Sequence, residues 1–286
     1  MPILARLVDL YEKRGIQVST GLNPNHFANY PYAPFTWFIR EGKSLTNGLG
    51  IAAQEIYFLE CLFARCHPQR LFIIGNSAGW GTLALGLLNQ AARVLAIDAG
   101  FDGNSLEGIE FTNRVATEEG IAAKAVKGVS PADVAEILRA QTMAPVDFAF
   151  IDGLHTVAQV QLDFDAIRPH AAPDCVYLFH DVQAFNLHEG IARIAEKSGL
   201  AWHLLLGTTS GMVIMHDGSR EPPWLADIAP FAARPATVDL IRGAAWDHRH
   251  RHLARWRRSL RKRLDRLRGW RMDVAGNASA RHRQPR

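Results

Sequence analysis

Apolar and polar positions along the chain follow two alternating patterns. Short apolar runs rich in β-branched residues, such as RLFIIG at residues 70–75, are typical of buried strands. They alternate with longer stretches in which apolar positions return every three or four residues, as in a helix. The predicted strands are residues 70–75, 93–100, 122–128, 145–153, 175–182, 201–207 and 211–217. The predicted helices are residues 1–14, 49–66, a stretch ending near residue 92, and residues 106–120, 130–141, 156–170 and 188–199.

This alternation predicts an α/β fold built on a doubly wound, mostly parallel, seven-stranded Rossmann-like sheet. The last two strands are separated by a short turn, which predicts that the final strand is antiparallel. Right-handed crossovers place the carboxyl ends of the parallel strands at one edge of the sheet, where ligands of such folds bind. Ser130 is predicted to cap the helix 130–141, with Pro131 at its first position.

The composition divides the chain into four segments. Residues 1–48 are expected to form a helical N-terminal cap and an aromatic lid, and no strand is predicted before residue 70. Residues 49–217 are expected to form the Rossmann-like domain. Residues 218–243 contain several prolines and are interpreted as a linker. Residues 244–286 are interpreted as a basic amphipathic helix followed by a disordered tail.

The charge of the chain is unevenly distributed. Residues 244–286 contain 14 Lys and Arg against three Asp, a net charge of +11 in a chain whose total is +4. The rest of the chain is therefore acidic, with a net charge of −7. The apolar residues of the basic segment recur at helical spacing, at Leu253, Trp256, Leu260, Leu264 and Leu267. This helix could pack on its own domain, on a second copy in a homo-oligomer, or on an anionic membrane surface, whereas a nucleic-acid partner is not expected.

Cysteine usage and the first residues point to a cytoplasmic protein. The three cysteines form no C-x-x-C pair and no evident disulfide framework, so reduced thiols are expected. Charged residues interrupt the apolar run at residues 1–15, which argues against a signal peptide. Residues 71–92 lack charges, but their glycines and asparagines indicate a strand, a turn and a helix rather than a membrane span.

The stretch RLFIIGNSAGWGT has three interpretations. As a G-x-S-x-G motif it would make Ser77 the nucleophile of an α/β-hydrolase, with Asp152 and His180 following in the order of that triad. However, such a fold places several strands before the nucleophile, and none is predicted here. As a G-x-G-x-x-A motif it would bind a dinucleotide, with Asp98 on the ribose. In that fingerprint the first glycine directly follows the strand, and here only Gly75 does so.

The third interpretation fits more of the chain, because residues 44–217 resemble the class I S-adenosylmethionine-dependent methyltransferases. The motifs that carry this resemblance are IIGNSAGWGT, AIDAG and FIDGLHTVAQVQLDFDAIRPHAAPDCVYLFHDV. Within that class the chain looks most like small-molecule O-methyltransferases that act on sugars and natural products. A glycine-rich loop without lysine suits this cofactor, which carries no phosphate.

The resemblance implies a set of cofactor-binding residues. The glycine loop would surround the amino-acid part of S-adenosylmethionine, the acid that ends the second strand would bind the ribose, and residues 127–130 match the adenine turn by position. The residues implied are Gly75, Asn76, Ser77, Gly79, Gly81, Asp98, Ser130 and Asp152. One position departs from the family pattern, since Ile73 stands where an acidic residue often precedes the first glycine.

Methyl transfer to a hydroxyl needs a base, or a cation that lowers the pKa of the hydroxyl. His155 follows Asp152 by three residues and is the candidate base. Asp152 and Asp181 end neighbouring strands and are candidate ligands of a divalent cation such as Mg²⁺. His180 is left with three roles: a third ligand, a second base, or a structural histidine. A non-catalytic binding protein with this fold is the alternative from a different functional class.

Overall fold

The computed structural model describes residues 2–21, 35–46, 50–102, 104–232, 234–250 and Leu260. The chain divides into two compact units, Met1–Ala233 and Arg234–Arg286, which are described separately. The first unit contains every strand of the described residues and the predicted site. The second contains the helix α9 (Pro235–Arg249).

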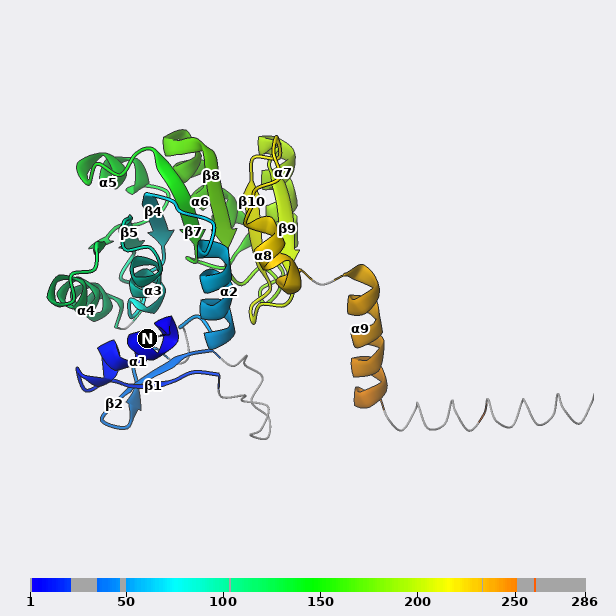
Figure 1. Cartoon of the computed structure of the whole chain (residues 1–286), viewed down its shortest axis with the longest axis horizontal. Helices are drawn as coiled ribbons and strands as arrows, with labels where there is room; N and C mark the ends of the chain where they lie inside the picture. The colour runs from blue at the N-terminus through cyan, green and yellow to red at the C-terminus, as the bar shows by residue number, and fades with distance from the viewer. Residues whose placement is uncertain are drawn as a thin grey trace, which may run out of the picture. The chain divides into compact units, whose positions relative to one another are not determined.

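A seven-stranded sheet forms the centre of the first unit (Figure 1). Its order is β6-β5-β4-β7-β8-β10-β9, in which β10 runs antiparallel to both of its neighbours and the other pairs are parallel. The strands are β4 (Arg70–Ile74), β5 (Arg93–Asp98), β6 (Ala123–Lys127), β7 (Val146–Ile151), β8 (Ala171–Phe179), β9 (Ala201–Leu205) and β10 (Met212–His216). The predicted fold class and the antiparallel final strand are therefore confirmed.

Helices cover both faces of this sheet. One face packs against α1 (Ile3–Glu12), α2 (Ala53–Phe63), α3 (Trp80–Leu88) and α4 (Ser105–Glu118). The other face packs against α5 (Val134–Ala140), α6 (Val157–Ile167) and α7 (His188–Ser198), and a short 3₁₀ turn, η2 (Arg168–His170), follows α6. Alternate residues of β4 divide between the two cores, with Leu71 and Ile73 on the first and Phe72 and Ile74 on the second. A strand buried on both faces explains the continuous apolar run in the sequence.

The predicted start of the fifth helix is wrong. Helix α5 begins at Val134, so Ser130 does not cap it. The Ser130 hydroxyl instead lies 2.5 Å from Oδ1 of Asp163 on α6, to which it donates a hydrogen bond. A long-range side-chain contact has thus replaced the local capping bond that the sequence pattern favoured.

The segment before residue 70 contains strands that the sequence analysis did not predict. These form a small antiparallel sheet in the order β1 (Gln17–Ser19), β2 (Trp37–Arg40) and β3 (Lys43–Ser44). Strands of two to four residues are too short to show an alternating pattern. Phe38 of β2 is buried and packs on the rings of Tyr11 and Trp80. Most of the predicted aromatic lid, residues 22–34, lies outside the described residues.

The proline-containing stretch after β10 is partly folded onto the first unit. Helix α8 (Leu225–Ile228) and the 3₁₀ turn η3 (Ala229–Phe231) bury Phe231 against Phe58 of α2. Helix α9 then starts at Pro235, within the predicted linker. Of the five apolar residues predicted for the basic tail helix, only Leu260 is described, as an exposed helical residue. No helix among the described residues is both long and apolar enough to span a membrane.

Candidate active site

The glycine loop joins β4 to α3 and depends on two of its glycines. Gly75 and Gly79 have φ angles of +101° and +84°, in the region that favours glycine. A Cβ atom on Gly75 would lie 2.0 Å from the carbonyl oxygen of Asp152, and one on Gly79 would lie 2.0 Å from Oγ1 of Thr112. By contrast, a Cβ atom on Gly81 would meet its nearest neighbour, Phe150, at 3.7 Å. The sequence motif contains all three glycines without distinction. In the structure, only Gly75 and Gly79 require glycine, whereas residue 81 has room for a Cβ atom.

Asp98 ends β5 and is bonded to the glycine loop. Its Oδ2 accepts hydrogen bonds from the backbone N–H groups of Asn76 and Ser77, at 3.0 and 2.8 Å. Its Oδ1 accepts from the N–H of Gly100 at 2.9 Å. A carboxylate has about four acceptor positions, so capacity for a further donor remains on this side chain. Asp98 therefore positions the loop as well as being the candidate ribose ligand.

The side chain of Asn76 is hydrogen-bonded inside the protein. It is buried, its Oδ1 accepts from the Thr82 hydroxyl at 2.9 Å, and its Nδ2 lies 3.1 Å from Oγ1 of Thr112. Helix α4 approaches so closely that a Cβ atom on Gly108 would lie 1.9 Å from the carbonyl oxygen of Ser77. The sequence analysis did not single out Thr112 or Gly108, which fix the far side of the loop.

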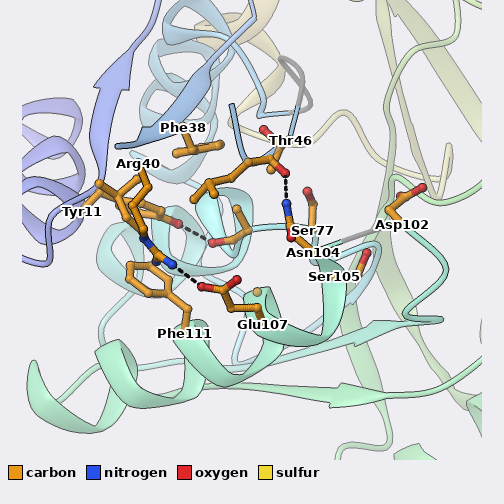
Figure 2. Close-up of a pocket in the computed structure, with 14 residues that line it drawn as sticks. Tyr11, Phe38, Arg40, Thr46, Ser77, Asp102, Asn104, Ser105, Glu107 and Phe111 are labelled. Carbon is orange, nitrogen blue, oxygen red and sulfur yellow. Dashed lines mark hydrogen bonds and ion pairs between the residues drawn. The ribbon is translucent and has the colours of Figure 1, made fainter. Parts of the chain in front are cut away.

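A pocket lies beside the glycine loop, between the small N-terminal sheet and α4 (Figure 2). Ser77 contributes from the loop, Thr46 from the segment before α2, and Asn104 from the residue that precedes α4. The Thr46 hydroxyl is buried without a hydrogen-bond partner. Phe38 and Phe111 supply the apolar part of the wall. Of the predicted cofactor residues only Ser77 lines this pocket.

Ser130 belongs to a hydrogen-bonded cluster beneath the predicted adenine turn. Its hydroxyl and the Gln159 amide both donate to Oδ1 of Asp163, and the Gln159 amide also donates to the Ser130 carbonyl. Asp163 is 1% exposed, and its burial raises the pKa of this carboxyl despite the two donors. The arrangement fixes the backbone that follows β6.

Four titratable side chains meet where β7 and β8 end: Asp152, His155, His180 and Asp181. One candidate ligand atom from each lies within 4.8 Å of the other three. His180 Nδ1 lies 2.9 Å from Asp152 Oδ1 and 3.5 Å from Asp181 Oδ1. His155 Nε2 lies 3.3 Å from Asp152 Oδ1 and 3.5 Å from Asp181 Oδ2. The structure thus brings together all four residues that the sequence placed at these strand ends.

A fifth residue, Glu55 of α2, completes the cluster and was missed by the sequence analysis. Its Oε2 lies 3.1 Å from Nε2 of His180, and its side chain is fully buried. It also accepts from the N–H of Ala52 and from both the N–H and the hydroxyl of Ser210. The only available signal was an acidic residue on the apolar face of a predicted helix.

These contacts favour positive charge at His180. Burial lowers the pKa of His180, but the charges of Asp152 and Glu55 outweigh burial and raise this pKa well above its ordinary value. Burial raises the pKa of Asp152, yet the two histidines bring it down to about 2. For His155, burial lowers the pKa and the Asp152 contact raises it, with a net increase. The favoured positive charge can be a proton on the ring or a metal cation among the donors.

The donor set fits a divalent cation. Two atoms of the cluster, Nδ1 of His180 and Oδ1 of Asp181, are buried without a hydrogen-bond partner. Two donor atoms that each bind the same cation at about 2.1 Å, with a right angle between the two bonds, lie about 3 Å apart. The contacts of 2.9 and 3.5 Å from His180 Nδ1 have this spacing. Asp152, His180 and Asp181 could therefore serve as ligands, as predicted.

The sheet order is that of a Rossmann-like fold, and the candidate sites lie at the carboxyl edge of its parallel strands. Residues 72–182 match the family model described as "Methyltransferase domain". The predicted resemblance to the class I S-adenosylmethionine-dependent methyltransferases is thereby confirmed, and the domain is that of an enzyme. A search of the curated proteins finds no significant match to the chain.

Three of the solved structures that are similar to this chain are methyltransferases by name. A methyltransferase from Geobacter sulfurreducens is 15% identical over 77% of this chain and 90% of its own, with a TM-score of 0.49. The O-methyltransferase TomG from Streptomyces achromogenes, solved with S-adenosylmethionine, is 16% identical over 76% and 91%, with a TM-score of 0.47. An O-methyltransferase from Bacillus cereus, solved with S-adenosylhomocysteine, is 15% identical over 57% and 78%, with a TM-score of 0.43.

Proposed function

We propose that the protein transfers the methyl group of S-adenosylmethionine to a hydroxyl oxygen of a small molecule. One observation carries this proposal. Gly75 of the glycine loop lies directly against the backbone of Asp152, as the 2.0 Å Cβ distance shows, and Asp152 belongs to the titratable cluster. A cofactor seated on the loop would therefore present its reactive end to side chains able to activate a hydroxyl.

On the cofactor side, the chain supplies backbone groups and one carboxylate. The backbone of Asn76 and Ser77 is fixed by Asp98, which leaves acceptor capacity for a ribose hydroxyl. The acidic contact that often lies two residues before the first glycine is missing, because residue 73 is isoleucine, whose side chain is buried in the core. When bound, S-adenosylmethionine supplies the electrophilic methyl group, and the residues around it need only align the acceptor and accept its proton.

On the acceptor side, His155 is better placed than His180 to act as the base. The side chain of His155 is 24% exposed, whereas that of His180 is 5% exposed and faces Glu55 and Asp152. Asp152 raises the pKa of His155, which increases its affinity for the acceptor proton. The rings of Phe185 and His155 pack at 4.6 Å between centroids, and Phe185 is half exposed, so an apolar surface adjoins the base. This combination suits a small acceptor with an apolar face.

A divalent cation held by Asp152, His180 and Asp181 would lower the pKa of a bound hydroxyl.

The hydrolase alternative requires a histidine bonded to Ser77. Within the described ranges, no histidine makes a hydrogen bond to the Ser77 hydroxyl, and His155 and His180 are paired with carboxylates. The geometry therefore favours methyl transfer.

Calorimetry with S-adenosylmethionine tests the cofactor side. We expect binding that Asp98→Ala weakens by about 1–3 kcal/mol, the range for leaving polar partners unpaired. Binding of NADH without any response to S-adenosylmethionine would refute this assignment.

Transfer of a labelled methyl group to a panel of hydroxyl acceptors tests the acceptor side. A general base typically contributes about 10²–10⁴-fold, so His155→Ala should lower turnover by that order while leaving cofactor affinity nearly unchanged. His188→Ala is the matched control, since His188 lies on α7 and contacts Gln183. Full activity of His155→Ala would remove the base from the mechanism.

A further inference from the structure

The two ring nitrogens of His180 have different surroundings. Nε2 faces Oε2 of Glu55 at 3.1 Å, on the side of α2. Nδ1 faces Asp152 and Asp181 and makes no hydrogen bond, although the side chain is only 5% exposed. A buried ring nitrogen without a hydrogen bond is uncommon, because leaving such a group unpaired is costly.

Glu55 determines which ring nitrogen carries a hydrogen. Its carboxylate accepts from three donors besides His180, namely the N–H of Ala52 and the N–H and hydroxyl of Ser210. Oε2 accepts from the backbone N–H of Ala52 and Oε1 from the backbone N–H of Ser210, and because a backbone N–H can only donate, both oxygens of Glu55 act as acceptors. The Nε2 atom of His180 must therefore be the donor in this contact. When a cation takes the place of the second ring proton, the lone pair of His180 is then on Nδ1, which faces the two aspartates.

We propose that Glu55 is a positioning residue that fixes His180 as a nitrogen ligand, so that the cluster binds a first-row transition-metal ion in preference to Mg²⁺. The inference rests on the proposed function only in assigning a cation to the acceptor side. A carboxylate that accepts the second N–H of a metal-bound histidine orients the ring and raises its basicity as a ligand. The Glu55–His180 contact has this arrangement.

The choice of ion follows from the donors. Mg²⁺ requires a near-octahedral shell and is bound in proteins mainly through oxygen. Imidazole nitrogen instead suits first-row transition-metal ions such as Fe²⁺, Ni²⁺, Cu²⁺ and Zn²⁺, of which series Mn²⁺ is the weakest-binding member and a convenient paramagnetic probe. The proposed set contains one nitrogen, from His180, and carboxylate oxygens from Asp152 and Asp181. Replacing that nitrogen by oxygen should therefore change the selectivity of the site more than its total affinity.

Metal binding by the full-length protein, after treatment with a chelator and dialysis, tests the inference without any turnover. Titration calorimetry with MnCl₂ and MgCl₂ gives the two affinities, and pulsed electron paramagnetic resonance of the Mn²⁺-loaded protein detects directly bound ¹⁴N. In the wild type we expect ¹⁴N coupling and preference for Mn²⁺. His180→Asn offers an oxygen near the place of Nδ1. This variant should lose the ¹⁴N coupling, and its ratio of Mn²⁺ affinity to Mg²⁺ affinity should fall at least about 10-fold. His188→Asn is the control and should match the wild type.

Glu55→Gln tests the positioning role. Loss of such an orienting carboxylate typically lowers metal affinity about 10–100-fold, so Mn²⁺ binding should weaken by that factor. Mg²⁺ binding should change less, a difference that general loss of structure would not produce. Thermal unfolding checks that the variant folds. If it does not, the His180→Asn comparison alone decides the matter.

Unchanged ¹⁴N coupling and an unchanged Mn²⁺ to Mg²⁺ ratio in His180→Asn would overturn the inference. Failure of the proposed function is distinguishable from this result. If S-adenosylmethionine does not bind but His180 is coupled to Mn²⁺, the metal assignment stands and methyl transfer is wrong. If methyl transfer proceeds with a cation that shows no coupling to nitrogen, methyl transfer stands and the metal assignment is wrong.

Discussion

Replacing Gly75 by alanine tests whether the glycine loop is shaped by the protein itself. The φ angle of +101° is unfavourable for an L-residue and should cost about 1–2 kcal/mol. The new Cβ atom would also lie 2.0 Å from the carbonyl oxygen of Asp152, where ordinary contacts lie at 3.4–4 Å. The Cβ position is fixed by the backbone of residue 75 and its partner is a backbone oxygen, so relief requires a shift of the loop or of the end of β7. Overpacking of this kind costs about 1–3 kcal/mol. We therefore expect Gly75→Ala to lower the free energy of unfolding by about 2–5 kcal/mol.

Gly81→Ala is the matched control, at the start of α3 just after the loop. Its Cβ atom would make an ordinary contact with Phe150, and the residue lies in α3, where alanine is favoured over glycine by about 0.5–1 kcal/mol. Urea unfolding of the two variants and the wild type, without cofactor, measures the difference. If Gly75→Ala were as stable as Gly81→Ala, the close approach of the loop to Asp152 would be wrong.

Three further predictions concern other parts of the chain. Burial raises the pKa of Asp163 in the folded state above the unfolded value of about 3.9. Between these two pKa values the folded state binds more protons than the unfolded state, so the free energy of unfolding falls as pH rises through that window. Asp163→Asn should lack this fall, which chemical unfolding at several pH values would show, and a parallel pH dependence would contradict it. Ser77→Ala should retain methyl transfer, whereas its inactivation together with covalent labelling of Ser77 would favour the hydrolase. Truncation after residue 233 should leave the thermal midpoint of the first unit unchanged, since the compact unit ends there, and a clear drop would show that α9 stabilises it.

The sequence predicts the central sheet because its strands are buried on both faces. In β7, five of the six residues are buried, so the apolar run marks the strand without help from its neighbours. The strands β1, β2 and β3 lack such a signal, since their residues are partly exposed and the runs are short. Residues 224–231 lie within the predicted linker, residues 218–243, which its prolines indicate. Their burial depends on contacts with α2 that no local pattern records.

The sequence places the active-site residues at strand ends but not their partners. Asp152 and His180 come together because β7 and β8 are parallel neighbours, with Ile151 opposite Phe179. Glu55 is 125 positions from His180 in the sequence, so nothing local connects them. Similarly, the role of Asp98 in fixing the loop depends on the backbone course of Asn76 and Ser77. Periodicity places elements and strand ends, whereas these hydrogen bonds depend on how the elements pack.

The segment from residue 50 to Glu55 connects the two halves of the site. The carbonyl oxygen of Ile51 accepts a hydrogen bond from the indole of Trp80, which is the first residue of α3 after the glycine loop. Four residues later, Glu55 contacts His180 at the other half. A change that displaces this segment should therefore alter both the loop and the orientation of His180. A substitution in this segment that alters only the glycine loop breaks the contact of Ile51 with Trp80. One that alters only the orientation of His180 breaks the contact of Glu55 with that histidine.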